Sequence, residues 1–423
     1  MTSEQKAIVY IFLPKDGYVP AGTLEHFPLE KRSVFQYGKK YLNRPNALPM
    51  DPVKIPLRDL IFETSMGQPV FNIFRDAAPD RWGRHILSIA AGTKAQAMTE
   101  FDILTALGPE NRVGALAFGP DPYSGPRANA TWYQKNPFEK PAVSLKDIAR
   151  YARRADQIDD DDMDDVKKDL AEDDLFKFFV PSLSPAGGAR PKAIIRHDNQ
   201  DWIAKFPKRG DIWNEPLIEH ACMTLANTCG ITVPETQIIK EEAIDILLIK
   251  RFDKDKFGNP LHMASGFTIA DLFEDQPWGS YQDLANAARR YGAASVGEQL
   301  FKRMIFNICC ANTDDHPRNH AFFIHREKID LTPAYDIVPC RYRFKEYNLA
   351  LNIGTHGRQA TLENALSNTG PFGLSKQEGM HIILKIRNTF NCWPDHFKKA
   401  GVSTKDMEEL QLRFSHSGTE LKI

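Results

Sequence analysis

The stretch from which the rest of this chain can be interpreted reads Asn312-Thr313-Asp314-Asp315-His316-Pro317-Arg318-Asn319-His320, followed by Tyr335-Asp336-Ile337. Asp314 stands five positions before Asn319, and Asp336 follows after a short hairpin-like stretch. ATP-dependent kinases use this order, with one carboxylate to accept the hydroxyl proton and then an Asn and an Asp to hold magnesium. The segment predicts a phosphoryl-transfer site with Asp314 as the base and Asn319 and Asp336 as metal ligands.

The residues between Asn319 and Asp336 support this interpretation. Ala321 to His325 and Ile329 to Leu331 look like the two strands of a hairpin, which would return Asp336 to the vicinity of Asn319. Magnesium prefers oxygen ligands and keeps some waters, so one amide and one carboxylate suffice beside ATP phosphates. The alternative is a turn rich in Asn and Asp that only caps helices.

A second chemistry is possible for the same loop. His316 and His320 are four residues apart and, together with Asp314, Asp315 or Asp336, could bind a transition metal for hydrolysis. Pro317 argues against it, because proline interrupts any helix that would place both imidazoles on one face.

Upstream segments offer a place for the nucleotide. Gly187 and Gly188 lie between candidate strands, where adjacent glycines let backbone N–H groups approach an anion, although a tight turn explains them equally well. Lys205, in the alternating strand 201–206, could reach phosphates as the strand lysine of kinases does, or face solvent. Glu215 and Glu219 share a face of the next helix, and either carboxylate could hold that lysine.

A possible hinge follows the strand 244–249. Lys250, Arg251 and Phe252 end this apolar strand, and between two lobes their backbone would meet the adenine edge while Phe252 packs nearby. A buried strand that runs into a turn is an equally compatible interpretation.

The distribution of patterns predicts an α+β chain with a bilobal, kinase-like layout. Short strands, with a helix capped by Asp80, indicate a small mixed domain at 1–140; strands and the helix 215–229 follow at 141–252. Helical periodicity dominates the third domain, 253–423, with helices at 281–291, 296–309, 376–390 and 404–412.

Bulk composition narrows the class of protein. The formal net charge is −1 and the pI about 6.9, so the chain as a whole is not built to bind nucleic acid or an anionic membrane. No apolar run approaches the roughly 20 residues of a membrane helix, and Ala7 to Leu13 reads as a strand rather than a signal peptide. Six scattered cysteines without a CxxC pair favour free thiols in a reducing cytoplasm.

Several of these segments together resemble the HipA family. They are Pro79 to Arg84, Gly114 to Phe118, Ser184 to Lys192, Ile203 to Pro207, Lys250 to Asp253, Asn312 to His320 and Pro333 to Asp336, and they run in order along nearly the whole chain. The resemblance implies a bilobal fold similar to protein kinase and phosphoinositide-kinase cores.

The resemblance also implies a function. HipA-like proteins are bacterial serine/threonine kinases that use ATP and Mg²⁺, act as toxins of toxin–antitoxin pairs, and take aminoacyl-tRNA synthetases as their best-known targets. A HipB-like helix-turn-helix antitoxin binds such a kinase and operator DNA together. By this resemblance Asp314 is the base, Asn319 and Asp336 hold magnesium, Lys205 contacts phosphates, Lys250 to Phe252 line the adenine site, and a loop serine, Ser184 first and Ser182 second, is autophosphorylated.

Two other functions remain open on the residues. One is a phosphotransferase whose acceptor is a small molecule or a lipid. The other is a catalytically silent kinase fold that acts only as a co-repressor subunit, against which the intact Lys205, Asp314, Asn319 and Asp336 argue.

Overall fold

The structure of the chain is a computed structural model. It describes residues 4–93, 97–129, 144–158, 165–183, 188–273, 279–292, 295–342, 346–415 and 417–419. The chain divides into two compact units, which we call the N-terminal unit (Met1–Arg209 with Asp253–Ala264) and the C-terminal unit (Gly210–Phe252 with Ser265–Ile423). The three-domain division at 140 and 252 remains a prediction.

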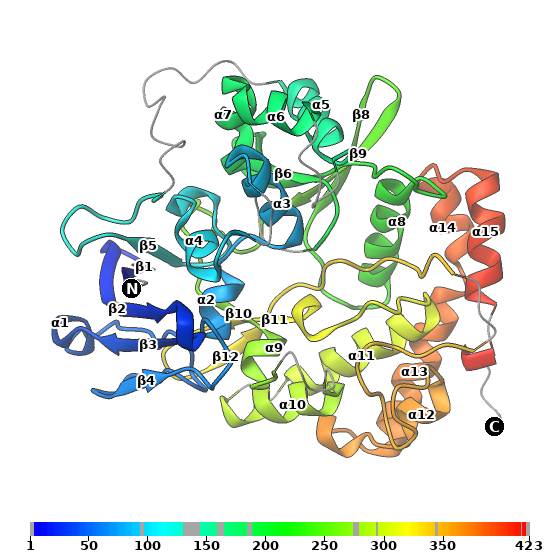
Figure 1. The fold of residues 1–423 in the computed structure, drawn as a ribbon. Coiled ribbons are helices and arrows are strands. Elements are labelled where there is room, and N and C mark those ends of the chain that lie inside the picture. The colour runs from blue at the N-terminus through cyan, green and yellow to red at the C-terminus, as the bar shows by residue number, and fades with distance from the viewer. Residues whose placement is uncertain are drawn as a thin grey trace. The chain divides into compact units, whose positions relative to one another are not determined.

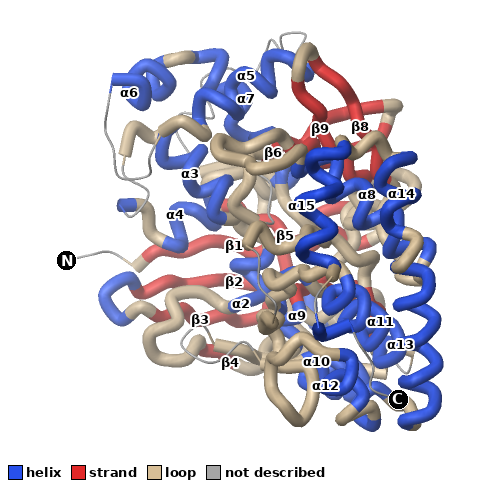
Figure 2. Tube along the Cα trace, turned by 90° about the vertical axis from the view of Figure 1, so that its right-hand side faces the viewer, coloured by secondary structure: helices blue, strands red, loops and turns tan. Residues whose placement is uncertain are grey.

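The N-terminal unit begins with a five-stranded antiparallel sheet, in the order β4-β3-β2-β1-β5 (Figures 1 and 2). Its strands are β1 (Gln5–Leu13), β2 (Gly17–Phe27), β3 (Arg32–Tyr37), β4 (Ile61–Glu63) and β5 (Leu116–Gly119). Successive residues of β1 point to opposite faces, yet Val9, Tyr10 and Ile11 are all buried. Both faces of this strand are therefore covered at these positions.

Seven helices of the N-terminal unit follow or interrupt this sheet among the described residues. They are α1 (Lys39–Leu42), α2 (Asn72–Asp76), α3 (Arg81–Ala90), α4 (Glu100–Thr105), α5 (Leu145–Ala155), α6 (Asp165–Glu172) and α7 (Asp174–Leu183). Asp80 caps α3, as predicted, by accepting a hydrogen bond from the Gly83 amide at 2.8 Å. Ser144 caps α5 in the same way, through the amide of Asp147.

The segment in front of the two glycines differs from the prediction. The two glycines were predicted to lie between strands, but the element in front of them is the helix α7, which ends at Leu183. The helical period of Phe176, Phe179 and Val180 places a buried apolar stripe against the unit, and Phe176 and Phe179 lie beside the Tyr151 ring. Packing of this stripe outweighs Pro181, which a helix tolerates less well in its interior.

After the glycines the chain forms the antiparallel hairpin of β6 (Lys192–His197) and β7 (Gln200–Lys205), in the positions where strands were predicted. Asp198 and Asn199 form its tip with φ of 48° and 59°. Left-handed backbone at both central residues is the geometry of the hairpin turn that matches the twist of the strands. The short strand β10 (Met263–Ser265) lies at the boundary of the two units in the sequence.

The C-terminal unit is mainly helical. Its helices are α8 (Glu215–Thr228), α9 (Gly266–Ile269), α10 (Tyr281–Arg290), α11 (Val296–Cys309), α12 (Leu362–Leu366), α13 (Lys376–Phe390), α14 (Trp393–Lys399) and α15 (Thr404–Phe414). Two antiparallel hairpins accompany them, β8 (Thr236–Glu241) with β9 (Ile244–Lys250) and β11 (Ala321–Ile324) with β12 (Ile329–Leu331). The predicted hairpin between Asn319 and Asp336 is therefore confirmed.

The core of the C-terminal unit forms around α11, which packs against α10 and α13 (Figure 2). Phe306 of α11 meets Phe390 edge to face at 5.6 Å between ring centroids, and Phe390 meets Phe414 at 5.2 Å. Such aromatic pairs add about 0.5–1.5 kcal/mol each to the free energy gained by burial. The core thus fixes the C-terminal end of α11, where the chain leaves for the Asn312 to His320 loop.

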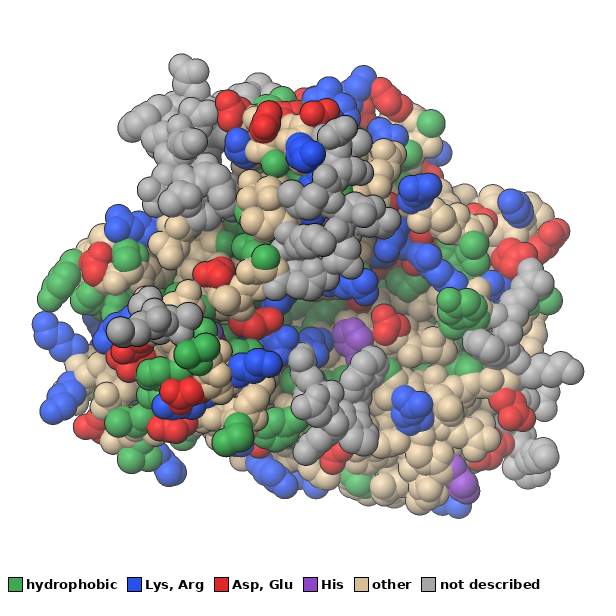
Figure 3. Space-filling view, in the orientation of Figure 1, with side chains coloured by type: hydrophobic (Ala, Val, Ile, Leu, Met, Phe, Trp, Pro, Cys, Tyr) green, Lys and Arg blue, Asp and Glu red, His purple; other side chains and the backbone are tan. Residues whose placement is uncertain are grey.

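Two surface properties agree with the composition. Acidic and basic side chains are interspersed over the face seen in Figure 3, with no large area of one sign. Among the described residues no helix is both long and apolar enough to cross a membrane.

All six cysteines are free thiols, and four of them are buried. Burial raises the pKa of Cys229 and of Cys309 to about 12.

Candidate functional site

The loop that carries the predicted base starts where α11 stops. Ala311 adopts a left-handed backbone with φ of 54°, which turns the chain away from the helix axis. The Asn312 amide then donates to the carbonyl of Asn307 at 3.0 Å, and Pro317–Asn319 form a single 3₁₀ turn. Proline suits the first position of such a turn because its fixed φ is helical and the missing N–H has no partner there.

Asp314, Asn319 and Asp336 come together within the C-terminal unit. The Asn319 side-chain amide donates to the carbonyl of Asp314 at 2.7 Å. Partial desolvation raises the pKa of the Asp314 carboxyl above its ordinary value; the charge of His316 lowers it, and the carboxylate of Asp336 raises it further. Tyr335 precedes Asp336 and its hydroxyl donates to the carbonyl of Arg318, which precedes Asn319, so the segments of Asn319 and Asp336 lie side by side.

This arrangement fits a magnesium ion by the chemistry of its donors. The Nδ2 group of Asn319 is engaged with Asp314, which leaves its Oδ1 as the free end of the amide. Asp336 sits in the left-handed region with φ of 58°, a conformation that Asp tolerates better than most residues. An amide oxygen and a carboxylate oxygen are the hard ligands that Mg²⁺ takes, and a cation would relieve the repulsion between Asp314 and Asp336.

The predicted hinge residues lie beside this site. The Phe252 ring stacks on Tyr335, with centroids 5.5 Å apart and planes 30° apart, and meets Phe323 edge to face. Tyr335 directly precedes Asp336, and its hydroxyl donates to the Arg318 carbonyl at 2.7 Å. Phe252 is thus placed next to the backbone that carries Asp336, the second predicted metal ligand.

Lys250 and Arg251 differ in their surroundings. Lys250 forms an ion pair with Glu235 at 3.1 Å on the surface of the β8–β9 hairpin. Arg251 is buried. Of the three predicted hinge residues, Phe252 contacts Tyr335, the residue before Asp336.

A buried hydrogen-bond network holds the Asn312 to His320 loop in place. Asp315 accepts from the Tyr281 hydroxyl at 2.6 Å and from the Ala350 amide at 2.7 Å, and burial raises the pKa of its carboxyl to about 7. The side-chain amide of Asn307 donates to the Tyr281 oxygen at 2.9 Å. The network continues from Asn307 through Asn312, whose Oδ1 accepts from the Asp314 amide at 3.3 Å.

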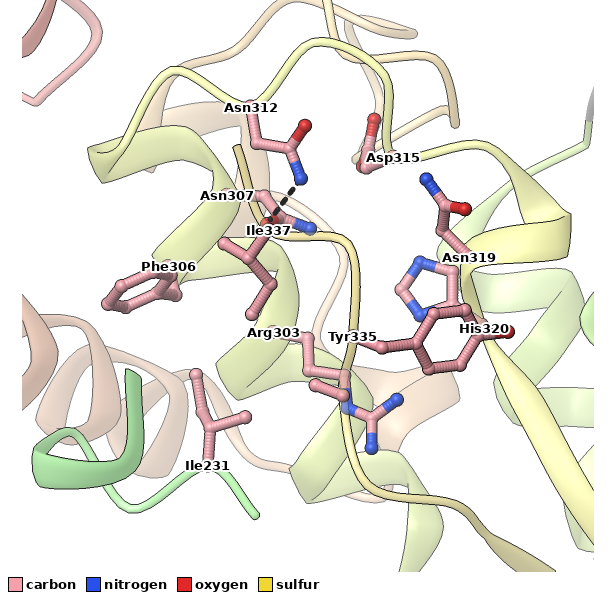
Figure 4. Close-up of a pocket in the computed structure, with 11 residues that line it drawn as sticks. Ile231, Arg303, Phe306, Asn307, Asn312, Asp315, Asn319, His320, Tyr335 and Ile337 are labelled. Carbon is pink, nitrogen blue, oxygen red and sulfur yellow. Dashed lines mark hydrogen bonds between the residues drawn. The ribbon is translucent and has the colours of Figure 1, made fainter. Parts of the chain in front are cut away.

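A small cavity lies inside this network, between α11 and the loop (Figure 4). Its volume is about 10 Å³, roughly the space of one water molecule. Asn312, Asp315, Asn319 and His320 line one part of it, and Arg303 and Tyr335 another. A cavity of this size is far too small for a nucleotide, so it belongs to the support of the loop.

The backbone of α9 braces the loop from another direction. The Gly266 amide donates to the His320 carbonyl at 2.6 Å, and a Cβ atom at Gly266 would lie 2.8 Å from the Pro317 carbonyl oxygen. The Arg318 guanidinium lies 3.9 Å from the centre of the Phe267 ring, within cation–π range. Only glycine allows this close approach of two backbones.

The remaining predicted residues fall in several places. Lys205 is buried at the end of β7. Gly188 belongs to the same N-terminal unit and lies before β6. Ser182 is in the last turn of α7, and Ser184 and Gly187 lie outside the described residues. Glu215 and Glu219 are both buried in α8; Glu215 accepts from the Trp213 indole and pairs with Arg341 at 3.6 Å.

The transition-metal alternative gains no support from the described residues. Among them no three His, Cys, Asp or Glu side chains converge to hold a metal. His320 is buried, and its ring packs edge to face on Tyr281 at 5.2 Å. Burial and the charge of Arg303 hold the pKa of His320 well below its usual range.

The sequence did not predict that Tyr281, Asn307 and Gly266 hold the Asn312 to His320 loop. It named Asp315 only as a possible metal ligand, whereas the carboxylate supports the loop. Asn307 lies five residues before Asn312, so a pair of asparagines at the end of a predicted helix was a usable signal. Tyr281 and Gly266 lie far from the loop in the sequence and gave none.

Comparison with solved structures defines the class of fold. The chain superposes on HipA of Shewanella oneidensis, in a complex of HipA, HipB and operator DNA, with a TM-score of 0.65 over 97% of this chain and 95% of that chain. Sequence identity is 16%, so the likeness concerns the fold, which is α+β and kinase-like with a helical C-terminal region. The chain belongs to the HipA family: residues 16–119 match the HipA N-terminal domain and 184–393 the HipA-like C-terminal domain.

Two curated relatives agree with this family. A protein of Sinorhizobium fredii named as a kinase is 27% identical over 177 residues, which cover 38% of this chain and 43% of the relative. The serine/threonine-protein kinase toxin HipA of Shewanella oneidensis is 23% identical over 208 residues, or 41% of this chain and 47% of that protein. The chain thus matches less than half the length of each of these two relatives.

Proposed function

We propose that the chain is an ATP- and Mg²⁺-dependent protein kinase that phosphorylates serine or threonine. Two hydrogen bonds carry the proposal: the Asn319 side-chain amide donates to the Asp314 carbonyl, and the hydroxyl of Tyr335, next to Asp336, donates to the carbonyl of Arg318, next to Asn319. The candidate base and the two candidate oxygen ligands thus lie on adjoining segments, in the order that kinases use. The family and the kinase names of its relatives support the same activity.

The roles of the residues follow from their geometry. Asp314 is exposed to solvent and accepts the proton of the acceptor hydroxyl at its carboxylate. Its raised pKa moves it toward the operating pH, where a general base is most effective. Asn319 and Asp336 hold the metal through one oxygen each, and Phe252 packs against the adenine side of the nucleotide.

Bound Mg²⁺ neutralises charge on the phosphates of the ATP substrate. In this proposal Lys205 contacts those phosphates, and Lys250, Arg251 and the Gly187-Gly188 segment belong to the nucleotide site. The buried network under Asp315 holds the loop in one conformation, which reduces the reorganisation needed when charge develops.

The test is phosphoryl transfer by the purified chain with ATP and magnesium. Asp314→Ala removes the base and should lower the rate by about 10²–10⁴. Asp330→Ala is the matched control, because Asp330 is an exposed carboxylate of the same unit that pairs with Lys328. A rate for Asp314→Ala equal to that of the unaltered chain would exclude the assignment.

The acceptor is a protein of the translation machinery, such as an aminoacyl-tRNA synthetase, in this proposal. Mass spectrometry of a cell extract incubated with the chain and ATP identifies it. A phosphorylated polypeptide supports the proposal, and a phosphorylated metabolite or lipid would replace it by the small-molecule alternative. No ATP binding in calorimetry with magnesium would instead indicate a silent co-repressor.

Autophosphorylation is part of the proposal, on Ser184 first and Ser182 second. Ser182 is half-buried in the last turn of α7, which makes it the poorer acceptor. A phosphate adds about −1.5 to −2 charge where ATP phosphates would bind, so the modification should switch the kinase off. Mass spectrometry of Ser184→Ala and Ser182→Ala chains after incubation with ATP decides between them.

The proposed partner is a HipB-like helix-turn-helix antitoxin that brings the kinase to operator DNA in the cytoplasm. The support is the fold shared with HipA of Shewanella oneidensis, whose structure contains HipB and operator DNA. Co-purification with the product of the gene directly upstream, followed by a gel shift with the operator, tests the assembly. Loss of the shift when the partner is omitted is the expected result.

A further inference from the structure

The N-terminus of α3 contacts both ends of the segment 188–192, which begins at the second of the two glycines. The Asp80 carboxylate binds the Lys192 ammonium at 2.5 Å, and the same ammonium donates to the Gly188 carbonyl at 2.8 Å. The Trp82 indole N–H donates to the Lys192 carbonyl at 3.1 Å. All four residues belong to the N-terminal unit.

Burial makes this contact stronger than a surface ion pair. The Lys192 side chain is 1% exposed and that of Asp80 12%. A buried pair that loses one partner leaves an uncompensated charge, which costs far more than loss of a solvated pair. Trp82, also buried, prevents water from replacing these bonds.

Asp80 is itself held in place. Its other carboxylate oxygen caps α3 through the Gly83 amide at 2.8 Å. The helix is anchored by α6 and α7, and His85 bonds through its ring to the Ala155 carbonyl of α5 at 2.9 Å. The carboxylate that meets Lys192 is therefore a rigid point of the unit.

We infer that Asp80 and Trp82 act as positioning residues for the nucleotide site, by fixing the chain where the glycine segment joins β6. Lys192 serves as the crosslink between Asp80 and Gly188. The inference rests on the proposed function, since it assigns the glycine segment to ATP. It makes nucleotide binding depend on a helix that lies outside the residues 184–393 matched to the HipA-like C-terminal domain.

The test uses Asp80→Asn in the full chain. Asparagine caps a helix as well as aspartate, so α3 keeps its cap while the charge opposite Lys192 is lost. We expect hydrogen exchange in a peptide spanning 188–192 to speed up about tenfold, and the KM for ATP to rise about tenfold with a smaller change in kcat. The matched control is Asp201→Asn, which removes a carboxylate paired with Arg196 at 2.9 Å on the exposed side of the same hairpin.

A second variant separates this role from direct phosphate binding by Lys192. Lys192→Met removes the crosslink and leaves the Asp80 carboxylate, which is 12% exposed and still caps α3, without its cation. The double variant Asp80→Asn/Lys192→Met leaves neither charge unpaired and should bind ATP no more weakly than Lys192→Met alone. If Lys192 instead bound phosphate itself, Asp80→Asn would release it and leave ATP affinity unchanged or higher. That result overturns the inference.

Two further outcomes are decisive. Unchanged hydrogen exchange at 188–192 in both Asp80→Asn and Lys192→Met overturns the inference. Thermal unfolding identifies a variant that folds poorly, and the exchange measured in the other variant then decides. Absence of ATP binding by the unaltered chain overturns the proposed function instead. The exchange measurement, which needs no nucleotide, then still shows whether the crosslink exists.

Discussion

Tyr281 of α10 and Asp315 of the loop after α11 are joined by a 2.6 Å hydrogen bond, although the two residues lie 34 positions apart in the sequence. The Tyr281 oxygen also accepts from Asn307, so one hydroxyl links two helices to the loop that carries Asp314. Burial strengthens this link because no water competes for its groups. The first prediction concerns that hydroxyl.

Tyr281→Phe should lower the free energy of unfolding by about 1–3 kcal/mol, because Asp315 and Asn307 each lose a partner inside the protein. Urea unfolding measures the change. Tyr123→Phe is the control, since Tyr123 is 95% exposed and should change stability by less than about 0.5 kcal/mol. Equal stabilities for the two variants would show that the buried network contributes nothing.

Gly266→Ala should move the loop and lower activity. The added methyl group would lie 2.8 Å from the Pro317 carbonyl oxygen, so α9 and the turn that holds Asn319 must separate. Overpacking of this kind costs about 1–3 kcal/mol. Chemical denaturation and the rate of phosphoryl transfer report the two effects. In Gly370→Ala, where a Cβ meets no atom within 4 Å, both should stay unchanged.

Phe252→Ala should weaken ATP binding. The ring stacks on Tyr335 beside Asp336, and its removal opens the face that we assign to adenine. We expect the Kd for ATP to rise about tenfold in calorimetry, which corresponds to about 1.4 kcal/mol. Phe257→Ala removes a phenylalanine that is 77% exposed and serves as the reference. Identical affinities of the two variants would argue against an adenine site at Phe252.

Stability should fall in mild acid because of two histidines in the C-terminal unit. Burial lowers the pKa of His220 and of His396 below the ordinary 6.5. His220 bonds to Thr236 at 2.8 Å and His396 to Thr224 at 2.9 Å. Below pH 6.5 the unfolded chain binds protons at these histidines that the folded chain excludes. The free energy of unfolding is therefore highest above pH 6.5, and this contribution is lost as the pH falls through the pKa values that the two histidines have in the folded chain.

Thermal unfolding at about pH 7.5 and about pH 5.5 tests this effect. The double variant His220→Gln/His396→Gln should lose less Tm between the two pH values than the unaltered chain. His325→Gln, at an exposed histidine that pairs with Asp330, should behave like the unaltered chain. If all three lose the same Tm, other groups cause the acid sensitivity.

Local patterns were sufficient for many elements of the fold. Helices predicted at 296–309 and 376–390 match α11 and α13, and the hairpin before Asp336 is present. Apolar periodicity and capping side chains such as Asp80 act over a few residues, so they can be read without knowledge of the rest of the chain. The helix that ends at Leu183 was missed because tertiary packing of Phe176 and Phe179 stabilises it.

Residue type and order along the chain were enough to propose the chemistry: Asp314, Asn319 and Asp336 follow the order in which kinases carry a base and two metal ligands. Folding decided which groups support those donors. The bond of Tyr281 to Asp315, the approach of Gly266 to Pro317 and the crosslink of Asp80 to Lys192 each join segments distant in sequence. Such contacts depend on how helices and loops pack, and packing follows from many side chains at once, so no local pattern records it.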